Sequence, residues 1–361
     1  MCTYEDNMLD LAGNFDVKGT VLEAKAFGSG HINDTFRVVV QEEDKNVCYV
    51  MQRLNKSIFP NPEAVMRNID LVTKHLKEKI TLQGGDPDRE TLTIIPAKDG
   101  RLGVSDENGE YWRMYRFIDG AKSYDQAEST QLFYESAVAF GHFQSMLSDF
   151  DASLLAEVLP GFHNTVNRYN DFQKTVKENR AERLSSAFQE TLWLTEHEDI
   201  AHVLCDRLAD GRLPLRVTHN DTKLNNIMMD PDTGKAVCVI DLDTVMPGLT
   251  ATDFGDAIRF GASTATEDER DISKVSLDLD LYKIYKKGFM EGCSDALTEE
   301  EVNMLPWGAL VITYEQALRF LGDYLNGDTY YKVDYPEHNL VRARTQIELA
   351  KDMIRKFEDM K

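Results

Sequence analysis

The sequence predicts an α+β fold in two lobes, with a small sheet-rich N-terminal lobe and a larger, mainly helical C-terminal lobe. The chain has 361 residues, more than one typical domain core needs. Short apolar runs separated by turn residues dominate its first third, whereas apolar residues recur at helical spacing from about residue 129. We therefore expect lobes at residues 1–118 and 119–361, with Gly120 as the hinge.

The N-terminal lobe is expected to contain several strands and one helix. The strands correspond to apolar or alternating runs between turn residues, at residues 21–26, 35–40, 48–54, 93–96 and 111–118. The helix begins at Asn61 and Pro62, and its apolar side chains recur on one face. The residues of that face are Val65, Ile69, Val72 and Leu76.

The C-terminal lobe is expected to be helical apart from one segment. Helical spacing starts near Ser129, and later amphipathic helices are predicted at about residues 182–209, 279–291, 298–325 and 338–358. The exception is residues 215–245, where short apolar runs have the length of strands, at residues 215–217, 227–229 and 237–240. These runs flank the densest group of catalytic-type side chains in the chain.

Composition and charge exclude several functional classes. Lysine and arginine number 40 against 62 aspartates and glutamates, so the net charge is −22, and we expect neither nucleic acid nor a membrane as a partner. No apolar run approaches the length of a membrane span, and the acidic N-terminus lacks the order of a signal peptide. The five cysteines are scattered without a C-x-x-C motif, which is typical of reduced thiols. We expect a cytoplasmic protein whose oligomeric state is unknown.

One segment contains the residues of a phosphoryl-transfer loop. His219, Asp221 and Asn226 have the spacing of a kinase catalytic loop, His-x-Asp followed by Asn five residues later. Asp221 is expected to accept the proton of an attacking hydroxyl, while Asn226 holds a metal ion on the phosphates. His219 is expected to orient the loop through hydrogen bonds of its ring. The motif alone is weak, because three fixed positions also occur in polar surface loops.

A second acidic motif follows at the distance of one β-hairpin. Asp241 and Asp243 come directly after the apolar run at residues 237–240. Two carboxylates and the amide of Asn226 would make a set of hard oxygen ligands that suits Mg²⁺. We therefore expect Asn226, Asp241 and Asp243 to bind the metal ion.

The residues Asp253, Phe254 and Gly255 spell the Asp-Phe-Gly motif of protein kinases, but they lie farther downstream and do not follow a strand. We interpret them as the start of a helix in which Asp253 or Asp256 bonds backbone near the catalytic loop, since buried carboxylates usually satisfy backbone donors. No recognisable activation segment lies between Asp241 and Asp253, which disfavours a protein kinase.

Nucleotide-binding residues are expected in the N-terminal lobe. The glycine-containing run at residues 27–33 joins two predicted strands, and its backbone N–H groups could approach phosphate closely, although such a run is often a simple hairpin turn. The strand at residues 111–118 is expected to offer backbone groups to adenine, a role compatible with a core strand. The residues expected at the nucleotide are Gly28, Ser29, Gly30, His31, Asn33, Gln52, Arg116 and Ile118.

Together these motifs resemble the aminoglycoside phosphotransferase and choline kinase superfamily, which implies a protein-kinase-like fold. Longer runs are similar to those of N-acetylhexosamine 1-kinases in that superfamily, at residues 28–33, 55–60, 216–226, 240–244, 254–264 and 335–342. The resemblance implies ATP, Mg²⁺ and phosphorylation of the anomeric hydroxyl of N-acetylglucosamine or N-acetylgalactosamine. It also implies that Asp221 is the base and that Asn226 and Asp241 are metal ligands. The residues it places at the sugar are Asp221, Phe260, Arg319 and Tyr330.

The chain departs from the kinase pattern at the position of the phosphate-pairing lysine. Gln52 stands there, Asp70 stands where the next helix would carry the partner glutamate, and Arg53 points to the opposite face of the strand. The usual lysine–glutamate pair is therefore absent or altered. Lys223, two residues after Asp221, is expected to supply the missing charge at the γ-phosphate, unless it is a solvated surface lysine.

Two alternatives stay open. The first is a related kinase for another small alcohol, such as an aminoglycoside, choline, homoserine or a thio-sugar, although a cationic substrate would require an acidic pocket rather than Arg319. Arg319 lies on an apolar helix face and needs a partner there, either the sugar or a carboxylate in a structural salt bridge. The second is a nucleotide-binding protein without catalysis, which only Gln52 favours.

Overall fold

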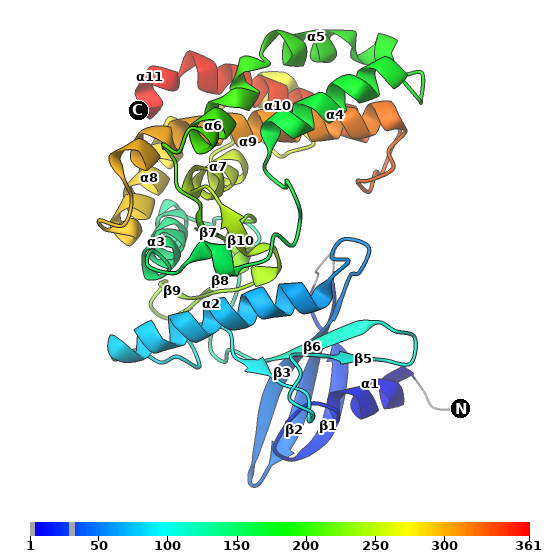
Figure 1. Ribbon diagram of the computed structural model, residues 1–361, viewed down its shortest axis with the longest axis vertical. Coiled ribbons are helices and arrows are strands. Elements are labelled where there is room, and N and C mark those ends of the chain that lie inside the picture. The colour runs from blue at the N-terminus through cyan, green and yellow to red at the C-terminus, as the bar shows by residue number, and fades with distance from the viewer. Residues whose placement is uncertain (1–3, 29–32) are drawn as a thin grey trace. The chain divides into compact units, whose positions relative to one another are not determined.

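The computed structural model (Figure 1) describes residues 4–28 and 33–361. The contacts within the chain group into two units. Unit 1 comprises Met1–Lys122, Ser153–Leu159 and Met228–Met246, and unit 2 comprises Ser123–Ala152, Pro160–Ile227 and Pro247–Lys361. Unit 1 contains most of the strands and unit 2 most of the helices, which confirms the predicted α+β fold. The segment 228–246 joins unit 1 partly through reciprocal backbone hydrogen bonds between Lys122 and Met229, of 2.8 and 2.9 Å. A single division after residue 118 does not describe this grouping.

Unit 1 is built on an antiparallel sheet with the order β1-β2-β3-β6-β4, and β5 also pairs with β6. The strands are β1 Thr20–Ala26, β2 Asp34–Glu42, β3 Lys45–Leu54, β4 Ile94–Ile95, β5 Val104–Ser105 and β6 Tyr111–Arg116. The predicted strands are all found, and only the two-residue β5 has no counterpart in the sequence pattern. β3 and β6 are neighbours, and their register places Gln52 directly opposite Arg113.

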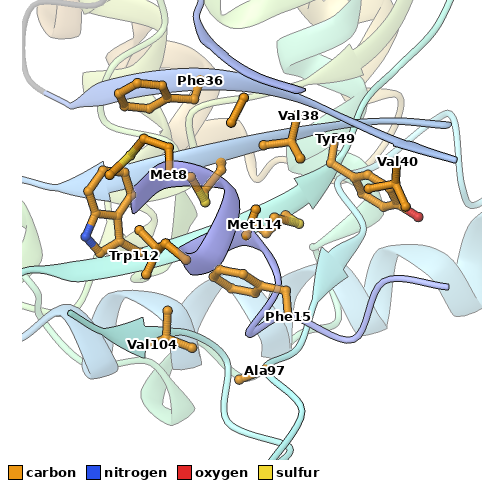
Figure 2. Packing of buried hydrophobic residues seen from close by; sticks show 14 residues of the cluster. Met8, Phe15, Phe36, Val38, Val40, Tyr49, Ala97, Val104, Trp112 and Met114 are labelled. Carbon is orange, nitrogen blue, oxygen red and sulfur yellow. The ribbon is translucent and has the colours of Figure 1, made fainter. Parts of the chain in front are cut away.

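The hydrophobic core of unit 1 forms between this sheet and α1 (Tyr4–Ala12), as Figure 2 shows. Met8 of α1 and Phe15 after it are buried with Val38, Met51 and Met114 of the sheet. α1 was not predicted from the sequence, because nine residues make only about two and a half turns and so give a short signal.

The long helix of unit 1, α2 (Pro62–Leu82), begins where the sequence predicts. The side chain of Asn61 accepts a hydrogen bond from the backbone N–H of Ala64 at 3.1 Å, which caps the helix just before its first-turn proline. All four apolar residues of the predicted face are buried. Asn68 is also buried on α2, and its Nδ2 donates to the carbonyl oxygens of Ala156 and Val245, at 2.7 and 2.9 Å.

Unit 2 consists of helices packed around the 28-residue helix α9. The helices are α3 Thr130–Met146, α4 Thr165–Glu178, α5 Phe188–Glu196, α6 Asp199–Ala209, α7 Thr250–Gly261, α8 Leu279–Cys293, α9 Glu299–Asn326, α10 His338–Arg355 and α11 Phe357–Met360. α9 begins at a capping box of Thr298 and Glu301 and ends at Gly327, whose φ is 92°. The helix predicted at 182–209 is interrupted at His197 and Glu198, and α4 was not predicted. No helix within the described residues has the length and apolar character needed to cross a bilayer.

The exceptional segment at residues 215–245 contains short strands, as predicted. β7 (Arg216–Thr218) pairs with β10 (Met246–Gly248), and β8 (Ile227–Met229) pairs with β9 (Ala236–Val239). Single turns of 3₁₀ helix complete the connections, at Ala152–Leu154, Leu184–Ala187, Leu224–Asn226, Leu242–Thr244 and Ile272–Lys274. The loop between β7 and Leu224–Asn226 contains the predicted catalytic residues.

Candidate active site

A buried histidine fixes the backbone of the predicted catalytic loop. His219 is fully buried, and its ring makes edge-to-face contacts with Phe140 and Phe143 of α3, with centroid distances of 5.5 and 6.1 Å. The Nδ1 atom of His219 accepts a hydrogen bond from the backbone N–H of Asp221 at 3.3 Å. This contact confirms that His219 orients the loop through its ring.

Two carboxylates of α7 bind the backbone of the same loop. Asp253 accepts hydrogen bonds from the backbone N–H groups of His219 and Asn220, both at 2.8 Å, and Asp256 accepts one from Thr222 at 3.2 Å. Asn220 has a φ of 63°, a left-handed conformation that needs support from its surroundings. The predicted structural role of Asp253 and Asp256 is therefore confirmed.

Helix packing explains the rest of the Asp-Phe-Gly run. Phe254 is fully buried and makes edge-to-face contacts with the rings of Tyr282 and Phe289 of α8. Gly255 lies so close to Gly308 of α9 that a Cβ atom at this position would collide with the carbonyl group of Gly308. The run thus marks the contact of α7 with its neighbouring helices.

Replacing Asp253 by alanine is expected to destabilise the fold rather than to remove metal binding. The change leaves two buried N–H groups and the side-chain amide of Gln144 without their acceptor, and each such donor costs about 1–3 kcal/mol. We expect the melting temperature, followed by tryptophan fluorescence, to fall by about 5 °C or more. Asp295→Ala, at an exposed position, is the control. A wild-type melting temperature combined with lost dependence on Mg²⁺ would reverse this assignment.

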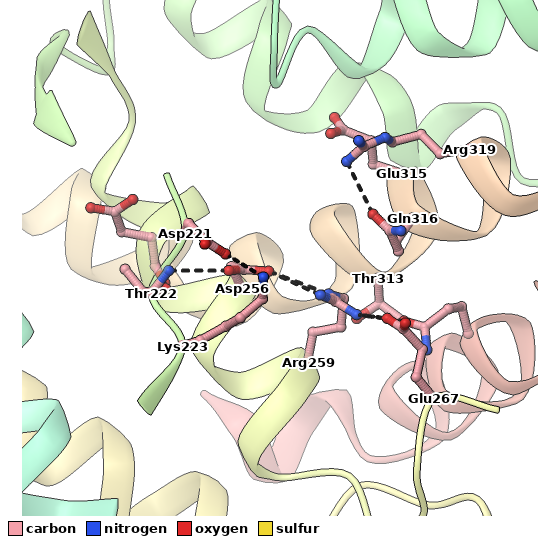
Figure 3. Close-up of polar contacts among 12 residues, drawn as sticks. Asp221, Thr222, Lys223, Asp256, Arg259, Glu267, Thr313, Glu315, Gln316 and Arg319 are labelled. Atoms are coloured by element: carbon pink, nitrogen blue, oxygen red, sulfur yellow. Dashed lines mark hydrogen bonds and ion pairs between the residues drawn. The ribbon is translucent and has the colours of Figure 1, made fainter. Parts of the chain in front are cut away.

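Asp221 is partly exposed and has two side-chain partners in unit 2. Its side chain is 28% exposed, and its Oδ1 lies 2.7 Å from Nζ of Lys223 (Figure 3). Nδ2 of Asn226 donates to Oδ2 of Asp221 at 3.1 Å and to its backbone carbonyl at 2.8 Å. Both hydrogen bonds use the amide nitrogen of Asn226, so its Oδ1 has no hydrogen-bond partner among the described residues. An amide oxygen of this kind suits a hard cation such as Mg²⁺.

Lys223 is an ion-paired side chain rather than a solvated surface lysine. It is 36% exposed. Burial would lower its pKa, but the carboxylates of Asp221 and Asp256 raise that pKa above its ordinary value, so the ammonium is charged at neutral pH. The series of charges continues beyond Asp256, because Arg259 lies 3.2 Å from Asp256 and 2.7 Å from Glu267 (Figure 3). Lys223 therefore places a fixed positive charge beside Asp221.

Arg319 of α9 has aromatic and amide partners. The guanidinium carbon lies 5.6 to 6.0 Å from the ring centroids of Phe162, Tyr330 and Tyr331. One guanidinium nitrogen donates to Oε1 of Gln316 at 3.1 Å (Figure 3). In the part of the chain that the structure describes, no carboxylate forms a direct ion pair with Arg319, although the carboxylate of Glu315 lies near enough to contribute to the raised pKa of this arginine.

A buried polar group lies one turn before Arg319. Glu315 accepts a hydrogen bond from Oγ1 of Thr165 at 2.7 Å and lies 2.9 Å from Nδ1 of His163. Burial would raise the pKa of Glu315, but His163 and Arg319 lower that pKa below its usual range. The other ring nitrogen of His163, Nε2, is buried without a hydrogen-bond partner among the described residues. Such an atom can be satisfied by a bound water or a polar ligand.

The two aromatic residues expected at the sugar are exposed. Phe260 is 46% exposed and Tyr330 is 65% exposed. Each lies beside an arginine, since the guanidinium of Arg259 is 5.6 Å from the ring of Phe260 and that of Arg319 is 6.0 Å from the ring of Tyr330. Both rings are therefore accessible to a ligand, and their role at a sugar stays a prediction.

The residues expected at the nucleotide differ in their surroundings. Gly28 has a φ of 81°, in the left-handed region that favours glycine, whereas Ser29, Gly30 and His31 lie outside the described residues. The exposed side chain of Arg116 forms an ion pair with Asp88 at 3.2 Å. The backbone N–H of Ile118 has no partner in the described part of the chain, so it remains available to a ligand.

The two expected metal ligands of the second acidic motif have different environments. Asp241 is exposed and has φ 58° and ψ 54°. Asp243 is buried, and its two oxygens accept hydrogen bonds from Arg113 and from Nδ2 of Asn33, the latter at 2.7 Å. These partners favour a structural role for Asp243 over the metal ligation that the sequence suggested.

The lysine–glutamate pair of kinases is altered, as the sequence indicates. Gln52 forms hydrogen bonds with Arg113 on the neighbouring strand, at 2.8 and 3.0 Å. Asp70 pairs with Lys74 along α2 at 2.8 Å and does not take the place of the missing glutamate. Arg113 was not predicted as a site residue, because no local pattern in the sequence shows which strand lies beside β3.

A comparison with protein families identifies the chain. The model of the phosphotransferase enzyme family matches residues 23–276, a stretch that contains the strands β2, β3 and β6, the catalytic loop and α7. The chain belongs to this phosphotransferase family. As a family member it is an enzyme that transfers a phosphoryl group to a hydroxyl group.

Solved structures with the same fold include other phosphotransferases. An aminoglycoside phosphotransferase from Alicyclobacillus acidocaldarius is 13% identical, with 97% of this chain and 96% of that chain covered and a TM-score of 0.61. A spectinomycin phosphotransferase, solved with ADP and spectinomycin, is 11% identical, with 99% and 100% covered and a TM-score of 0.59. A choline kinase from Cryptosporidium parvum is 15% identical, with 93% and 90% covered and a TM-score of 0.51. At these identities the likeness establishes the kinase-like two-lobed fold of the phosphotransferase and no more.

Proposed function

We propose that this phosphotransferase uses ATP and Mg²⁺ to phosphorylate the anomeric hydroxyl of N-acetylglucosamine or N-acetylgalactosamine. The observation that carries the choice of acceptor is the surroundings of Arg319, a cation beside three aromatic rings and an amide. A fixed cation disfavours cationic acceptors such as choline and aminoglycosides and suits a neutral molecule rich in oxygen acceptors. The similarity of the longer sequence runs to N-acetylhexosamine 1-kinases supports the sugar.

Three further features of unit 2 fit a neutral sugar. The exposed rings of Phe260 and Tyr330 offer apolar faces, and ligand sites commonly combine such faces with a few polar groups that fix orientation. The buried carboxylate of Glu315 is already used by Thr165 and His163, so it is not free to attract an ammonium group. Nε2 of His163 supplies one further polar atom that a hydroxyl or a water could satisfy.

ATP is the proposed phosphoryl donor, bound by residues of unit 1. A spectinomycin phosphotransferase of the same fold was solved with ADP and also with AMP. In this chain Gly28 has a left-handed backbone, and the N–H of Ile118 is available for adenine. The remaining residues proposed for this role are Ser29, Gly30, His31 and Arg116.

Mg²⁺ would be held by the amide oxygen of Asn226 and the carboxylate of Asp241. Each offers the hard oxygen donor that Mg²⁺ prefers, since Oδ1 of Asn226 has no hydrogen-bond partner among the described residues and Asp241 is exposed. When bound, the ion neutralises charge on the phosphate groups.

Asp221 would act as the base in the transfer. It accepts the proton of the anomeric hydroxyl while a bond forms between that oxygen and the γ-phosphorus and the bond from this phosphorus to the leaving oxygen of ADP breaks. An anomeric hydroxyl is more acidic than an ordinary alcohol, so the transfer of its proton to the base is less unfavourable. Catalysis is then mainly positioning of the reactants and neutralisation of phosphate charge. Lys223 beside Asp221 is the proposed cation for the γ-phosphate.

Methyl glycosides of the two N-acetylhexosamines should not be phosphorylated, because the methyl group blocks the reactive hydroxyl. The free sugars and their methyl glycosides would be incubated with ATP, Mg²⁺ and the enzyme, and the products analysed by ³¹P NMR and mass spectrometry. We expect a sugar 1-phosphate from the free sugars alone. A phosphorylated methyl glycoside would show that another hydroxyl is the acceptor.

A further inference from the structure

An arginine on β6 supplies a charge close to the position where kinases place a lysine on β3. Gln52 and Arg113 are register partners, so their side chains stand next to each other on one face of the sheet. Nε and Nη2 of Arg113 donate to Oε1 of Gln52 at 3.0 and 2.8 Å, and Nε2 of Gln52 donates to Oγ1 of Thr35 at 3.0 Å. Both polar groups of Gln52 are thus engaged within the sheet, which favours a role in holding Arg113 over the expected nucleotide contact.

The partner of Arg113 comes from the acidic motif of unit 1. Nη1 of Arg113 donates to Oδ1 of Asp243, and the arginine side chain is only 1% exposed. Burial would lower the pKa of Arg113, but Asp243, Tyr115 and Asp241 raise that pKa, so the guanidinium stays charged. Each guanidinium nitrogen already donates a hydrogen bond, and the side chain is almost fully buried, so a direct contact with phosphate would first have to expose the guanidinium.

This ion pair lies two residues from the exposed carboxylate proposed to bind the metal ion. Asp241 has a left-handed backbone, which is costly for residues other than glycine, although aspartate tolerates it better than most. The turn that follows Asp241 is fixed at two points: Arg113 holds the side chain of Asp243, and Nδ2 of Asn68 holds the carbonyl of Val245 at 2.9 Å. The turn is therefore anchored from β6 and from α2.

We infer that Arg113 is a positioning residue, which acts through Asp243 to present Asp241 to the metal ion and so sets the metal-dependent part of nucleotide binding. The inference rests on the proposed use of Mg²⁺ and ATP. A buried ion pair contributes little net stability compared with apolar residues of the same size. Residues that orient a metal ligand, in contrast, commonly change metal affinity by about 10–100-fold when they are replaced.

The test is a calorimetric titration of ADP with excess Mg²⁺ and, separately, with EDTA. The double variant R113M/D243N removes both charges together, which avoids a single buried charge, and retains an amide oxygen for Asn33. We expect the ADP affinity of this variant in EDTA to stay within about twofold of that of the wild type. The factor by which Mg²⁺ increases the ADP affinity should fall about tenfold or more. The double variant Q52R/R113Q exchanges the two side chains, so the cation lies on β3 and Asp243 is kept. This variant should retain most of the increase in ADP affinity that Mg²⁺ causes in the wild type. Arg101→Met, at an exposed arginine paired with Asp99, is the control.

Melting curves of every variant accompany the titrations, and Arg113→Lys keeps the test possible if the double variant does not fold. The lysine retains the charge but cannot bond Gln52 and Asp243 as a fork, so we expect an intermediate loss of the Mg²⁺-dependent gain. An unchanged gain in a folded variant without the ion pair would overturn the inference. An equal loss with Mg²⁺ and with EDTA would also overturn it, because it would indicate a direct phosphate contact. A wild-type enzyme that does not bind ADP under either condition would instead overturn the proposed function.

Discussion

Asp221→Asn is expected to lower kcat by about two to four orders of magnitude, because the asparagine cannot accept the proton of the attacking hydroxyl. The substitution is nearly isosteric, and the side chain is partly exposed, so the loop should keep its backbone hydrogen bonds to Asp253 and Asp256. Nucleotide affinity and melting temperature should therefore change little. The measurement is steady-state release of ADP, with ADP binding followed separately by calorimetry.

Thr222→Ser, in the same loop as Asp221, is the control for this variant. The serine retains a hydroxyl, which in Thr222 donates to the backbone carbonyl of Asp253 at 2.6 Å. A loop that is merely sensitive to substitution would lose activity in both variants. A wild-type kcat in Asp221→Asn would remove Asp221 from the role of base.

Lys223→Met is expected to lower kcat by about two to three orders of magnitude while the KM for ATP changes far less. Negative charge on the transferring phosphoryl group must be neutralised in the transition state, and Lys223 is a charged side chain 2.7 Å from Asp221. The methionine has a similar length and removes the charge together with the N–H donors of the ammonium group. Steady-state kinetics with varied ATP separate the effect on kcat from the effect on KM.

Two comparisons make the result for Lys223 specific. Lys223→Arg keeps the positive charge and should recover part of the lost kcat. Lys235→Met, at an exposed lysine, should leave kcat unchanged. An unchanged kcat in Lys223→Met would mean that metal ions and backbone groups alone neutralise the phosphate charge.

The sequence predicts those elements of the fold that have strong local signals. α2 combines a capping asparagine, a proline in its first turn and a buried face at helical spacing, and it begins where predicted. α1 is too short to show a period, and α4 buries only Thr165, Tyr169 and Phe172, so its apolar signal is weak. Length and the number of buried positions thus decide which helices can be predicted.

In the candidate site, residues whose partners are close in the sequence were predicted, whereas residues whose partners are distant in the sequence were not. The spacing within residues 219–226 predicts the loop, and the position of Asp253 at the start of a helix predicts its bonds to the loop backbone. Arg113 could not be found in this way, since its partners Gln52 and Asp243 are 61 and 130 residues away along the chain. The contact of Arg319 with Phe162 was also unpredictable, because Phe162 lies on a separate segment.

The proposed acceptor is tested by the rate of ADP release by the wild-type enzyme with ATP, Mg²⁺ and a panel of acceptors. The panel contains N-acetylglucosamine, N-acetylgalactosamine, glucose, choline, ethanolamine, homoserine, a thio-sugar and an aminoglycoside, each tested over a range of concentrations. We predict that kcat/KM for at least one N-acetylhexosamine exceeds that for every cationic acceptor by about a hundredfold or more, a difference of about 2.7 kcal/mol in transition-state binding. Choline, ethanolamine or an aminoglycoside as the preferred acceptor, with the N-acetylhexosamines inactive, would contradict the account.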